Sequence, residues 1–425
     1  MNSKRKHPGF WIPSLYMAEG LPYVAVMTIS VILYKRLGIS NTDIALYTGW
    51  LYLPWVIKPF WSPFVDLVKT KRWWTVTMQF IIAIAFACIA FSLPTSCFFQ
   101  LSLAAFWLVA FTSATHDIAA DGFYMHALDD HEQSFYVGIR STFYRIANVA
   151  GQGLLVILAG WLETQTDNIP LAWMVVFGVL SAFFLLASLY HQYVLPRPVS
   201  DKPVSNVSPK TIVREFVRTF ESFFTKKNAG VAILFMLLYR LPEAQLVKLI
   251  NPFLLDPLEK GGLGLTTSEV GFVYGTVGII GLTVGGILGG FAVAQGGLRK
   301  WLWPMALAIT LPDLVYVYLS YVQPAELTVV NVCIFVEQFG YGFGFTAYML
   351  YLIYFSEGEH KTAHYAICTG IMALGMMLPG MVAGWLQETL GYQHFFVWTI
   401  VCCLATYVVC AFLKIDPEFG KKKSE

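Results

Sequence analysis

A chain of 425 residues in which 57% are hydrophobic and only 13% are charged is not an ordinary soluble protein. Soluble domains carry roughly a quarter charged residues, so about half of the usual solubilising charge is missing. The net charge of +2 is too small to indicate nucleic-acid binding, and the seven cysteines lack the C-x-x-C spacing of a metal site.

Apolar stretches long enough to cross a bilayer recur along the whole chain. A membrane helix needs about 20 residues, and only helices or closed barrels satisfy the backbone in lipid. The stretches are too long for barrel strands and lack their alternation, so we predict an all-α membrane protein with twelve transmembrane helices. The predicted spans are residues 9–34, 44–65, 73–94, 98–121, 136–160, 170–193, 228–255, 268–293, 300–321, 326–354, 362–387 and 393–413.

Basic residues gather at one set of span ends, which predicts the orientation in the membrane. One side receives the residues Lys4, Arg5, Lys6, Lys69, Lys71, Arg72, Arg299, Lys300, Lys361, Lys414, Lys421, Lys422 and Lys423. The opposite side receives Lys35, Arg36 and Lys260. We therefore expect both termini to be cytoplasmic, in a multi-pass protein of the inner (cytoplasmic) membrane.

A polar stretch divides the chain into two halves of six spans each. Residues 196–227 are rich in Pro, Ser and Lys, and they separate residues 1–195 from residues 228–425. Within the linker, Phe216, Phe220 and Phe223 recur at helical spacing, and Arg214 and Arg218 fall on the opposite face. This pattern predicts an amphipathic helix along the cytoplasmic interface.

Several carboxylates fall at membrane depth, where a charge costs at least about 2.5 kcal/mol. Glu19 lies in the first span, Glu243 in the seventh and Glu337 in the tenth. Desolvation disfavours the charged form of a carboxylate, so such a group can exchange a proton near neutral pH. We predict these three as proton-coupling residues. The alternative is that each forms a permanent ion pair for packing.

Other polar and aromatic residues of the spans are candidates for substrate binding. Arg145, Asn148 and Gln152 form a stripe along the fifth span, and Pro242 can open the backbone between Arg240 and Glu243. The predicted binding residues are Tyr144, Arg145, Asn148, Gln152, Tyr239, Arg240, Lys248, Gln338, His116, Asp117, His364 and Tyr365. For any single aromatic residue, packing against lipid or core is the commoner role.

Glycines recur in the second half. Gly281, Gly285 and Gly289 lie four residues apart, which predicts close approach of a neighbouring helix. The run from Gly340 to Gly344 is expected to bend or thin the tenth span. The chain has no G-x-x-x-x-G-K-[ST] motif, so we expect no nucleotide-driven motor and no cofactor.

Two loops resemble the G-x-x-x-D…[RK][RK] loop of the major facilitator superfamily. The first runs from Ser62 to Asp66, with Ser in place of Gly, and is followed by Lys71 and Arg72. The second, at residues 290–300, has Ala in place of Asp, so both copies are degenerate. The resemblance implies a cytoplasmic latch. The predicted gating residues are Lys58, Asp66, Lys71, Arg72 and Asp121. For the loop residues, the alternative is ordinary charge flanking a membrane span. For Lys58 and Asp121, the alternative is that each belongs to a permanent ion pair, in which Lys58 pairs with Asp117 or Asp121.

Longer strings resemble the muropeptide permease (AmpG-type) family, which is related to the acetyl-CoA transporters. Residues 53–66, LPWVIKPFWSPFVD, are similar to the family's L-P-x-x-x-K-x-x-W-[AS]-P-x-x-D. Residues 113–121, SATHDIAAD, are similar to its S-A-T-Q-D-I-x-x-D, and residues 238–244, LYRLPEA, to its L-Y-[KR]-L-G-D-A. His116, Pro242, Glu243 and His364 replace the family's Gln, Gly, Asp and Gln.

The resemblance implies a major facilitator fold, with spans three, six, nine and twelve as outer supports around a cavity lined by the others. Asp313 falls in support span nine, where it is expected to meet a neighbouring helix or the outer interface. It also implies proton-driven import of a glycan-derived solute such as an anhydromuropeptide, an amino sugar or an oligosaccharide.

Two other functions are weighed against this one. The first is a carrier of another solute class, such as an acyl-CoA or a lipophilic export substrate. The second is an enzyme using His116 and Asp117 as acid and base, which is disfavoured because no nucleophile or metal cluster accompanies the pair. We expect a monomeric transporter whose partners are a glycan substrate, protons and the lipid bilayer.

Overall fold

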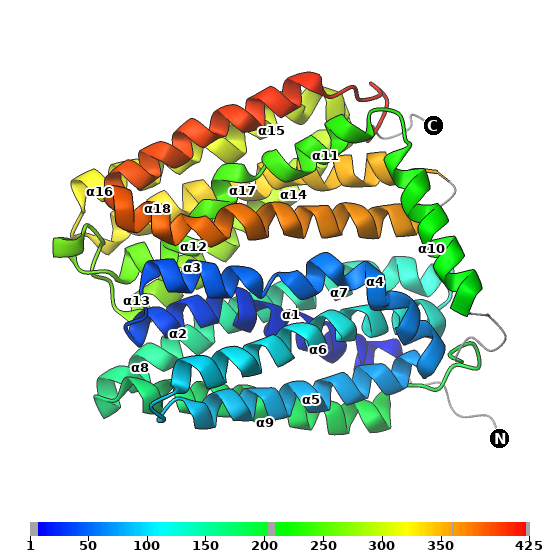
Figure 1. The fold of residues 1–425 in the computed structure, drawn as a ribbon, viewed down its shortest axis with the longest axis horizontal. Helices are drawn as coiled ribbons and strands as arrows, with labels where there is room; N and C mark the ends of the chain where they lie inside the picture. The colour runs from blue at the N-terminus through cyan, green and yellow to red at the C-terminus, as the bar shows by residue number, and fades with distance from the viewer. Residues whose placement is uncertain (1–6, 203–208, 359–360, 422–425) are drawn as a thin grey trace. The chain divides into compact units, whose positions relative to one another are not determined.

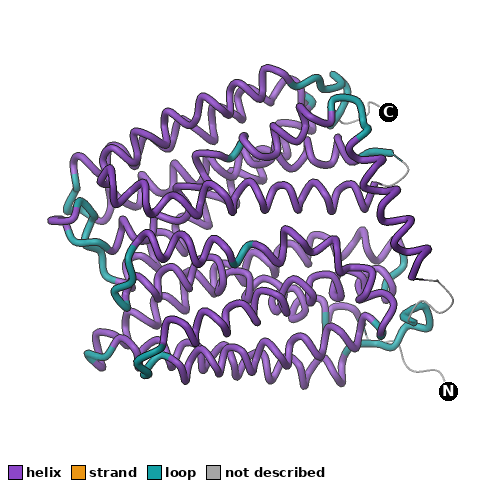
Figure 2. The backbone as a smooth tube through the Cα atoms, in the orientation of Figure 1, coloured by secondary structure: helices purple, strands orange, loops and turns teal. Residues whose placement is uncertain are grey.

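The computed structural model describes residues 7–202, 209–358 and 361–421. The described residues form helices joined by short turns, and no strand occurs among them (Figure 2). The prediction of an all-α protein is therefore confirmed. The chain divides into two compact units, Met1–Leu37 with Ile57–Pro209, and Gly38–Val56 with Lys210–Glu425. The boundaries predicted at residues 195 and 228 stay a proposal.

The helices of the first unit occupy the blue to green part of the chain (Figure 1). They are α1 (Ile12–Val24), α2 (Ser30–Arg36), α4 (Leu53–Val68, from Ile57 onward), α5 (Lys71–Ser92), α6 (Phe98–Ala127), α7 (Asp130–Asn148), α8 (Val156–Thr166) and α9 (Ile169–Val194).

The second unit contains α3 (Asn41–Trp50) and the helices that follow the linker. These are α10 (Pro209–Phe224), α11 (Ala229–Leu238), α12 (Leu241–Leu255), α13 (Thr267–Phe272), α14 (Ile279–Gly296), α15 (Leu298–Thr310), α16 (Leu314–Val322), α17 (Leu327–Ser356) and α18 (Lys361–Phe412).

Ten segments of the described chain are long and apolar enough to span a membrane. One of them, Ala363–Phe412, is 50 residues long and is broken at Gly391, where φ is 74° and ψ is 162°. The second predicted span consists of α3 and α4, which are separated by a turn at Leu51 and Tyr52. These two features explain why ten segments are consistent with twelve predicted spans.

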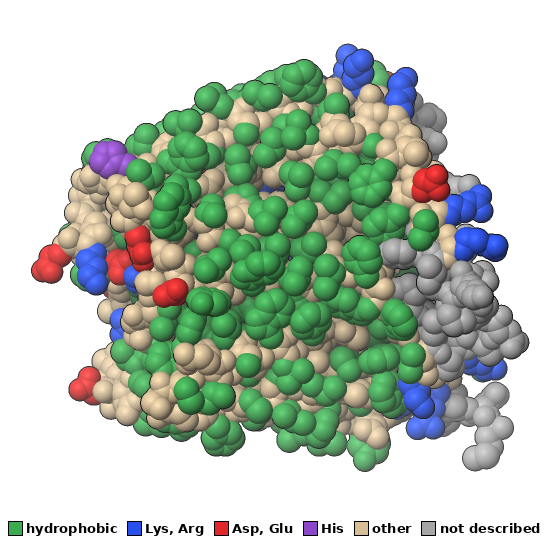
Figure 3. All heavy atoms as spheres, viewed as in Figure 1, with side chains coloured by type: hydrophobic (Ala, Val, Ile, Leu, Met, Phe, Trp, Pro, Cys, Tyr) green, Lys and Arg blue, Asp and Glu red, His purple; other side chains and the backbone are tan. Residues whose placement is uncertain are grey.

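The outward sides of the helices are apolar. Hydrophobic side chains cover most of the visible face, and charged side chains gather near the helix ends (Figure 3). Large exposed residues such as Phe91, Leu186 and Phe291 lie on the helix sides. This distribution suits hydrocarbon around the sides of the helices and water at their ends.

Three of the spans contain a wide π-helical segment near their middle. The segments are η2 (Ala25–Ile29), η3 (Val149–Leu155) and η5 (Val273–Gly278). Such segments shift the helical phase and are frequent at functional sites. Two of them, η2 and η3, pack together in the first unit, where a Cβ added at Gly151 would lie 2.6 Å from Val24 Cγ1.

The glycines of the second unit bring helices close together, as predicted. A Cβ added at Gly281 would lie 2.7 Å from the carbonyl oxygen of Phe335 in α17, and Gly285 and Gly289 meet the same helix. On α17, Gly340 and Gly344 face α15. The tenth span is one continuous helix, α17, and its glycines admit close neighbours, which agrees with the thinning predicted for this run, whereas a bend stays a prediction.

The amphipathic helix α10 contacts the ends of α17 and α18. Phe223 packs edge-on against Phe355, and Ser222 Oγ lies 2.9 Å from His364 Nε2. The Lys226 amine donates to the carbonyl oxygens of Phe355 at 2.6 Å and Glu357 at 2.8 Å. Burial lowers the pKa of this amine from its ordinary value. The helix is thus fastened at its C-terminal end.

Candidate functional site

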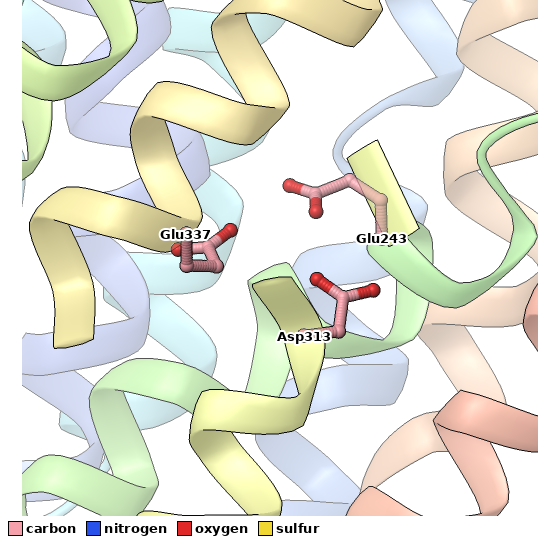
Figure 4. A group of neighbouring side chains, drawn as sticks. All are labelled: Glu243, Asp313 and Glu337. Carbon is pink, nitrogen blue, oxygen red and sulfur yellow. The ribbon is translucent and has the colours of Figure 1, made fainter. Parts of the chain in front are cut away.

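Three carboxylates from separate segments of the second unit meet in its interior (Figure 4). Glu243 lies in the first turn of α12, Asp313 ends η6 (Leu311–Asp313), a 3-10 helix of one turn, and Glu337 lies in α17. One oxygen of each lies within 4.8 Å of the others, and their exposed fractions are 2%, 2% and 1%. We call Glu243, Asp313 and Glu337 the acidic trio.

A break in the seventh span positions the first member. Helix α11 ends at Leu238 and α12 begins at Leu241. Arg240 has φ −107° and ψ 21°, and Pro242 follows in the first turn of α12. Pro lacks a backbone donor and is tolerated in the first turn of a helix. The predicted opening of the backbone near Pro242 is therefore present.

The members of the trio differ in their hydrogen bonding. Glu337 Oε2 accepts from the Tyr316 hydroxyl at 2.7 Å and from Gln338 Nε2 at 2.9 Å. Within the described part of the chain, Glu337 Oε1 and both carboxylate oxygens of Glu243 have no hydrogen-bond partner. Asp313 Oδ2 lies 4.0 Å from Cys403 Sγ.

The trio cannot carry three negative charges in this position without compensation. Two unit charges no more than 4.8 Å apart repel by at least roughly 3.5 kcal/mol at an effective dielectric constant near 20. Burial adds a desolvation cost for each ionised group. Arg240 supplies one positive charge that interacts with Glu243. Bound protons or a bound cation must balance the remaining negative charges.

Aromatic rings surround Arg240. Its guanidinium donates to the Tyr341 hydroxyl and lies 4.7 Å from the ring centre of Phe345 and 6.0 Å from that of Tyr348. Tyr239, its neighbour, is fully buried and donates to the carbonyl oxygen of Gly344 at 3.0 Å. Cation–π contacts of this kind hold a charged group in an apolar place.

A buried lysine lies further along α12. Lys248 is 1% exposed, donates to Thr48 Oγ1 at 2.9 Å and lies 5.1 Å from the ring centre of Tyr52. Thr48 belongs to α3, which packs against α12 and α18 in the second unit. Lys248 is thus a basic group held inside the protein by neutral partners.

The first unit has its own set of charged residues. Lys58 Nζ lies 3.6 Å from Asp117 Oδ2, which confirms one of the two predicted pairings of Lys58. An Arg140 nitrogen lies 2.7 Å from Asp121 Oδ1. Glu19 is buried beside them and interacts electrostatically with both aspartates. Its Oε2 has no hydrogen-bond partner among residues 7–202, 209–358 and 361–421.

The predicted polar stripe of the fifth span is only partly buried. Arg145 is exposed, and Tyr144, Asn148 and Gln152 are half-buried. The backbone of Tyr144 contacts Gly20 of α1, where an added Cβ would lie 3.2 Å from the Tyr144 carbonyl oxygen. The stripe therefore begins close to Glu19, and its role in binding stays a prediction.

Two predicted binding histidines are engaged elsewhere. His116 Nε2 lies 2.9 Å from Gln79 Nε2, whose Oε1 lies 2.8 Å from His191 Nδ1. This series of polar contacts joins α6 to α5 and α9. His364 faces α10 through Ser222, and Tyr365 packs against the apolar core of the second unit. Contact of these three residues with substrate stays a prediction.

Two of the predicted gating residues, Lys71 and Arg72, lie at the start of α5, whereas Lys58 and Asp66 belong to α4 and Asp121 to α6. The side chain of Asp66 is outside the described residues. The backbone amides of Lys71 and Arg72 donate to the Asp201 carboxylate at 2.6 and 3.0 Å. Arg72 Nε also donates to the carbonyl oxygen of Leu195 at 3.2 Å. These contacts fasten the start of α5 to the start of the linker and to the end of α9, and a gating role stays a prediction.

Comparison with known proteins places this geometry in a family. The chain matches the Major Facilitator Superfamily model over residues 14–356. It is 26% identical over 421 residues to the anhydromuropeptide permease of Escherichia coli K12, covering 96% of this chain and 80% of that protein. It is also 26% identical over 420 residues to a Rickettsia conorii protein named provisionally as transporter AmpG 4, covering 95% and 96%.

Solved structures share the fold. A D-xylose–proton symporter superposes with a TM-score of 0.69 at 13% identity, covering 97% of this chain and 98% of that one. The nucleoside transporter NupG superposes with a TM-score of 0.67 at 14% identity, covering 95% and 99%. These relatives are transporters rather than enzymes. The chain belongs to the Major Facilitator Superfamily and is a multi-pass membrane transporter similar to AmpG-type permeases along nearly its whole length.

Proposed function

We propose that the protein is a proton-coupled importer of a glycan-derived solute, such as an anhydromuropeptide, an amino sugar or an oligosaccharide. The observation that carries the cargo class is the likeness to an anhydromuropeptide permease over 96% of the chain. Transport would proceed by alternating access in the inner (cytoplasmic) membrane. We further propose a monomer with both termini in the cytoplasm, on the asymmetry of the basic residues.

Buried carboxylates support the coupling to protons. Glu243 and Glu337 each keep at least one buried oxygen without a hydrogen-bond partner in the described chain, and so does Glu19 in the first unit. An ionised group in such a place is costly, whereas a protonated one is tolerated. A change of access to water on either side would therefore load or release a proton at these residues.

The basic residues of the second unit support an anionic cargo. Muropeptides carry carboxylates, and the cation Arg240 and the basic residue Lys248 are held among aromatic and hydroxyl groups. Arginine pairs readily with carboxylates. The aromatic rings beside Arg240 also offer faces suited to the apolar side of a sugar ring.

Uptake into proteoliposomes tests the proposal. The purified full-length protein is reconstituted, and a labelled anhydromuropeptide is offered with and without an inward proton gradient. We expect accumulation that depends on the gradient and is competed by unlabelled anhydromuropeptide. Counterflow without a gradient serves as the control for intact transport.

Two outcomes contradict the proposal. Counterflow of an acyl-CoA with none of the anhydromuropeptide would assign the protein to another cargo class. Accumulation of the anhydromuropeptide that is independent of the proton gradient would contradict the proposed proton coupling but support the proposed cargo.

A further inference from the structure

We propose that Asp313 is the third carboxylate of the coupling site, and that Glu243, Asp313 and Glu337 bind protons as one group. This inference rests on the proposed proton coupling and adds a residue from the ninth span, which is an outer support in the family arrangement. It predicts that removing any one member changes the proton affinity of the other two.

The first support is convergence. The three carboxylates come from α12, η6 and α17, and their side chains reach one common space (Figure 4). Their oxygens lie within 4.8 Å of one another. A charge on any member therefore acts strongly on the others, so their protonation is coupled.

The second support is the state of Glu243. This side chain is 2% exposed and is directed into the group. Neither of its oxygens has a hydrogen-bond partner among the residues that the structure describes. A carboxyl that served packing alone would have its oxygens paired, because buried polar groups are normally hydrogen-bonded. Glu243 instead keeps both oxygens available for a proton or a cation.

The third support is the local backbone at Asp313. The ninth span tightens there from an α-helix to one 3-10 turn: α15 ends at Thr310, the turn Leu311–Asp313 follows, and α16 begins at Leu314. Pro312 lies inside this turn. A helix that only supports its neighbours does not need a buried acid at this depth. The Asp313 carboxylate lies beside those of Glu243 and Glu337.

The surroundings of the trio decide how it titrates. The groups that face it from the packed elements are Arg240 before α12, Tyr274 in η5, Tyr316 in α16, Gln338 in α17 and Cys403 in α18. Arg240 is the cation in this set and balances one carboxylate. The remaining two carboxylates are balanced when two protons are bound, and release of one proton leaves a single negative charge.

The test is the variant Asp313→Asn in the full-length protein. Loss of one negative charge weakens proton binding by the other two carboxylates. We expect the pH of half-maximal gradient-driven uptake to fall by about one unit or more. Counterflow of the anhydromuropeptide should stay within about twofold of the wild-type rate, because the proposed change is in coupling rather than in cargo binding.

Two further variants keep the test decisive. Asp313→Glu retains the acid on a longer side chain, so it should keep gradient-driven uptake with a displaced pH profile, even if Asp313→Asn does not fold. Glu163→Gln neutralises a carboxylate that is 8% exposed and pairs with Arg36 outside the trio. It should leave the pH profile unchanged.

The failures of the two proposals are distinguishable. If the wild type shows gradient-driven uptake and both Asp313 variants share its pH profile, Asp313 is not part of the coupling site and the proposed function survives. If wild-type accumulation requires Na⁺ and ignores the proton gradient, the protein is not proton-coupled, and both proposals are overturned.

Discussion

Arg140 and Asp121 form an ion pair in the first unit, with 2.7 Å between guanidinium nitrogen and carboxylate oxygen. Lys58 pairs with Asp117 at 3.6 Å. Two bases thus face three acids, because Glu19 lies beside both aspartates. The net charge of these five residues is zero when one proton is bound. Glu19 is the member whose buried Oε2 lacks a hydrogen-bond partner in the described chain.

Glu19→Gln should therefore separate coupling from stability. The amide removes the surplus charge without breaking either ion pair, so the unfolding temperature in detergent should stay the same or rise. Gradient-driven accumulation should be lost, and counterflow should remain. Accumulation at the wild-type level would exclude Glu19 from coupling, and Glu163→Gln again serves as the control.

Arg140→Gln should weaken the first unit. The Arg140 guanidinium lies 4.5 Å from the ring centre of Tyr16 in addition to its pairing with Asp121. Both charged side chains are about a third exposed, so the pair is worth roughly 1 kcal/mol. Thermal unfolding of Arg140→Gln, Asp121→Asn and the double variant measures this coupling. Additive effects would mean that the two residues do not stabilise each other.

The spans and the depth of the acids are predictable from sequence because both depend on local properties. A run of about 20 apolar residues must cross the bilayer, and a carboxylate inside such a run must lie at depth. Which helices meet is a tertiary property. The sequence therefore identifies Glu243 and Glu337 but not their joint contact with Asp313, which joins residues far apart in the chain.

The direction of a side chain around its helix is a second limit. His116 and Asp117 are adjacent, so they point about 100° apart on α6. Asp117 pairs with Lys58, whereas His116 contacts Gln79. The motif matched by residues 113–121 includes both positions, but it does not indicate which neighbouring residue each one contacts. No family string marks Arg140, although a basic residue within the fifth predicted span is itself a usable signal.

Glu337→Gln and Glu243→Gln should each abolish uphill uptake while sparing solute exchange. Each removes one proton-binding group from the acidic trio, whose other members remain. Uptake and counterflow in proteoliposomes across a pH series measure both effects. If uptake still follows the proton gradient in both variants, these residues have no coupling role.

Gly285→Ala tests the close contact of α14 with α17 against a control on the same helix. A Cβ at Gly285 would overlap the carbonyl oxygen of Phe339, which is backbone and cannot move aside. Overpacking of this kind costs about 1–3 kcal/mol. Gly290, five residues further along α14, has no atom within 4 Å of an added Cβ among the described residues. Gly290→Ala should leave stability unchanged or slightly raise it, because alanine is the better helix former.

Both variants are measured by thermal unfolding in detergent and by counterflow. Equal behaviour of the two would mean that α14 and α17 are not in close contact in the membrane. A stable Gly285→Ala protein that has lost counterflow would instead indicate that these helices must slide past each other during transport.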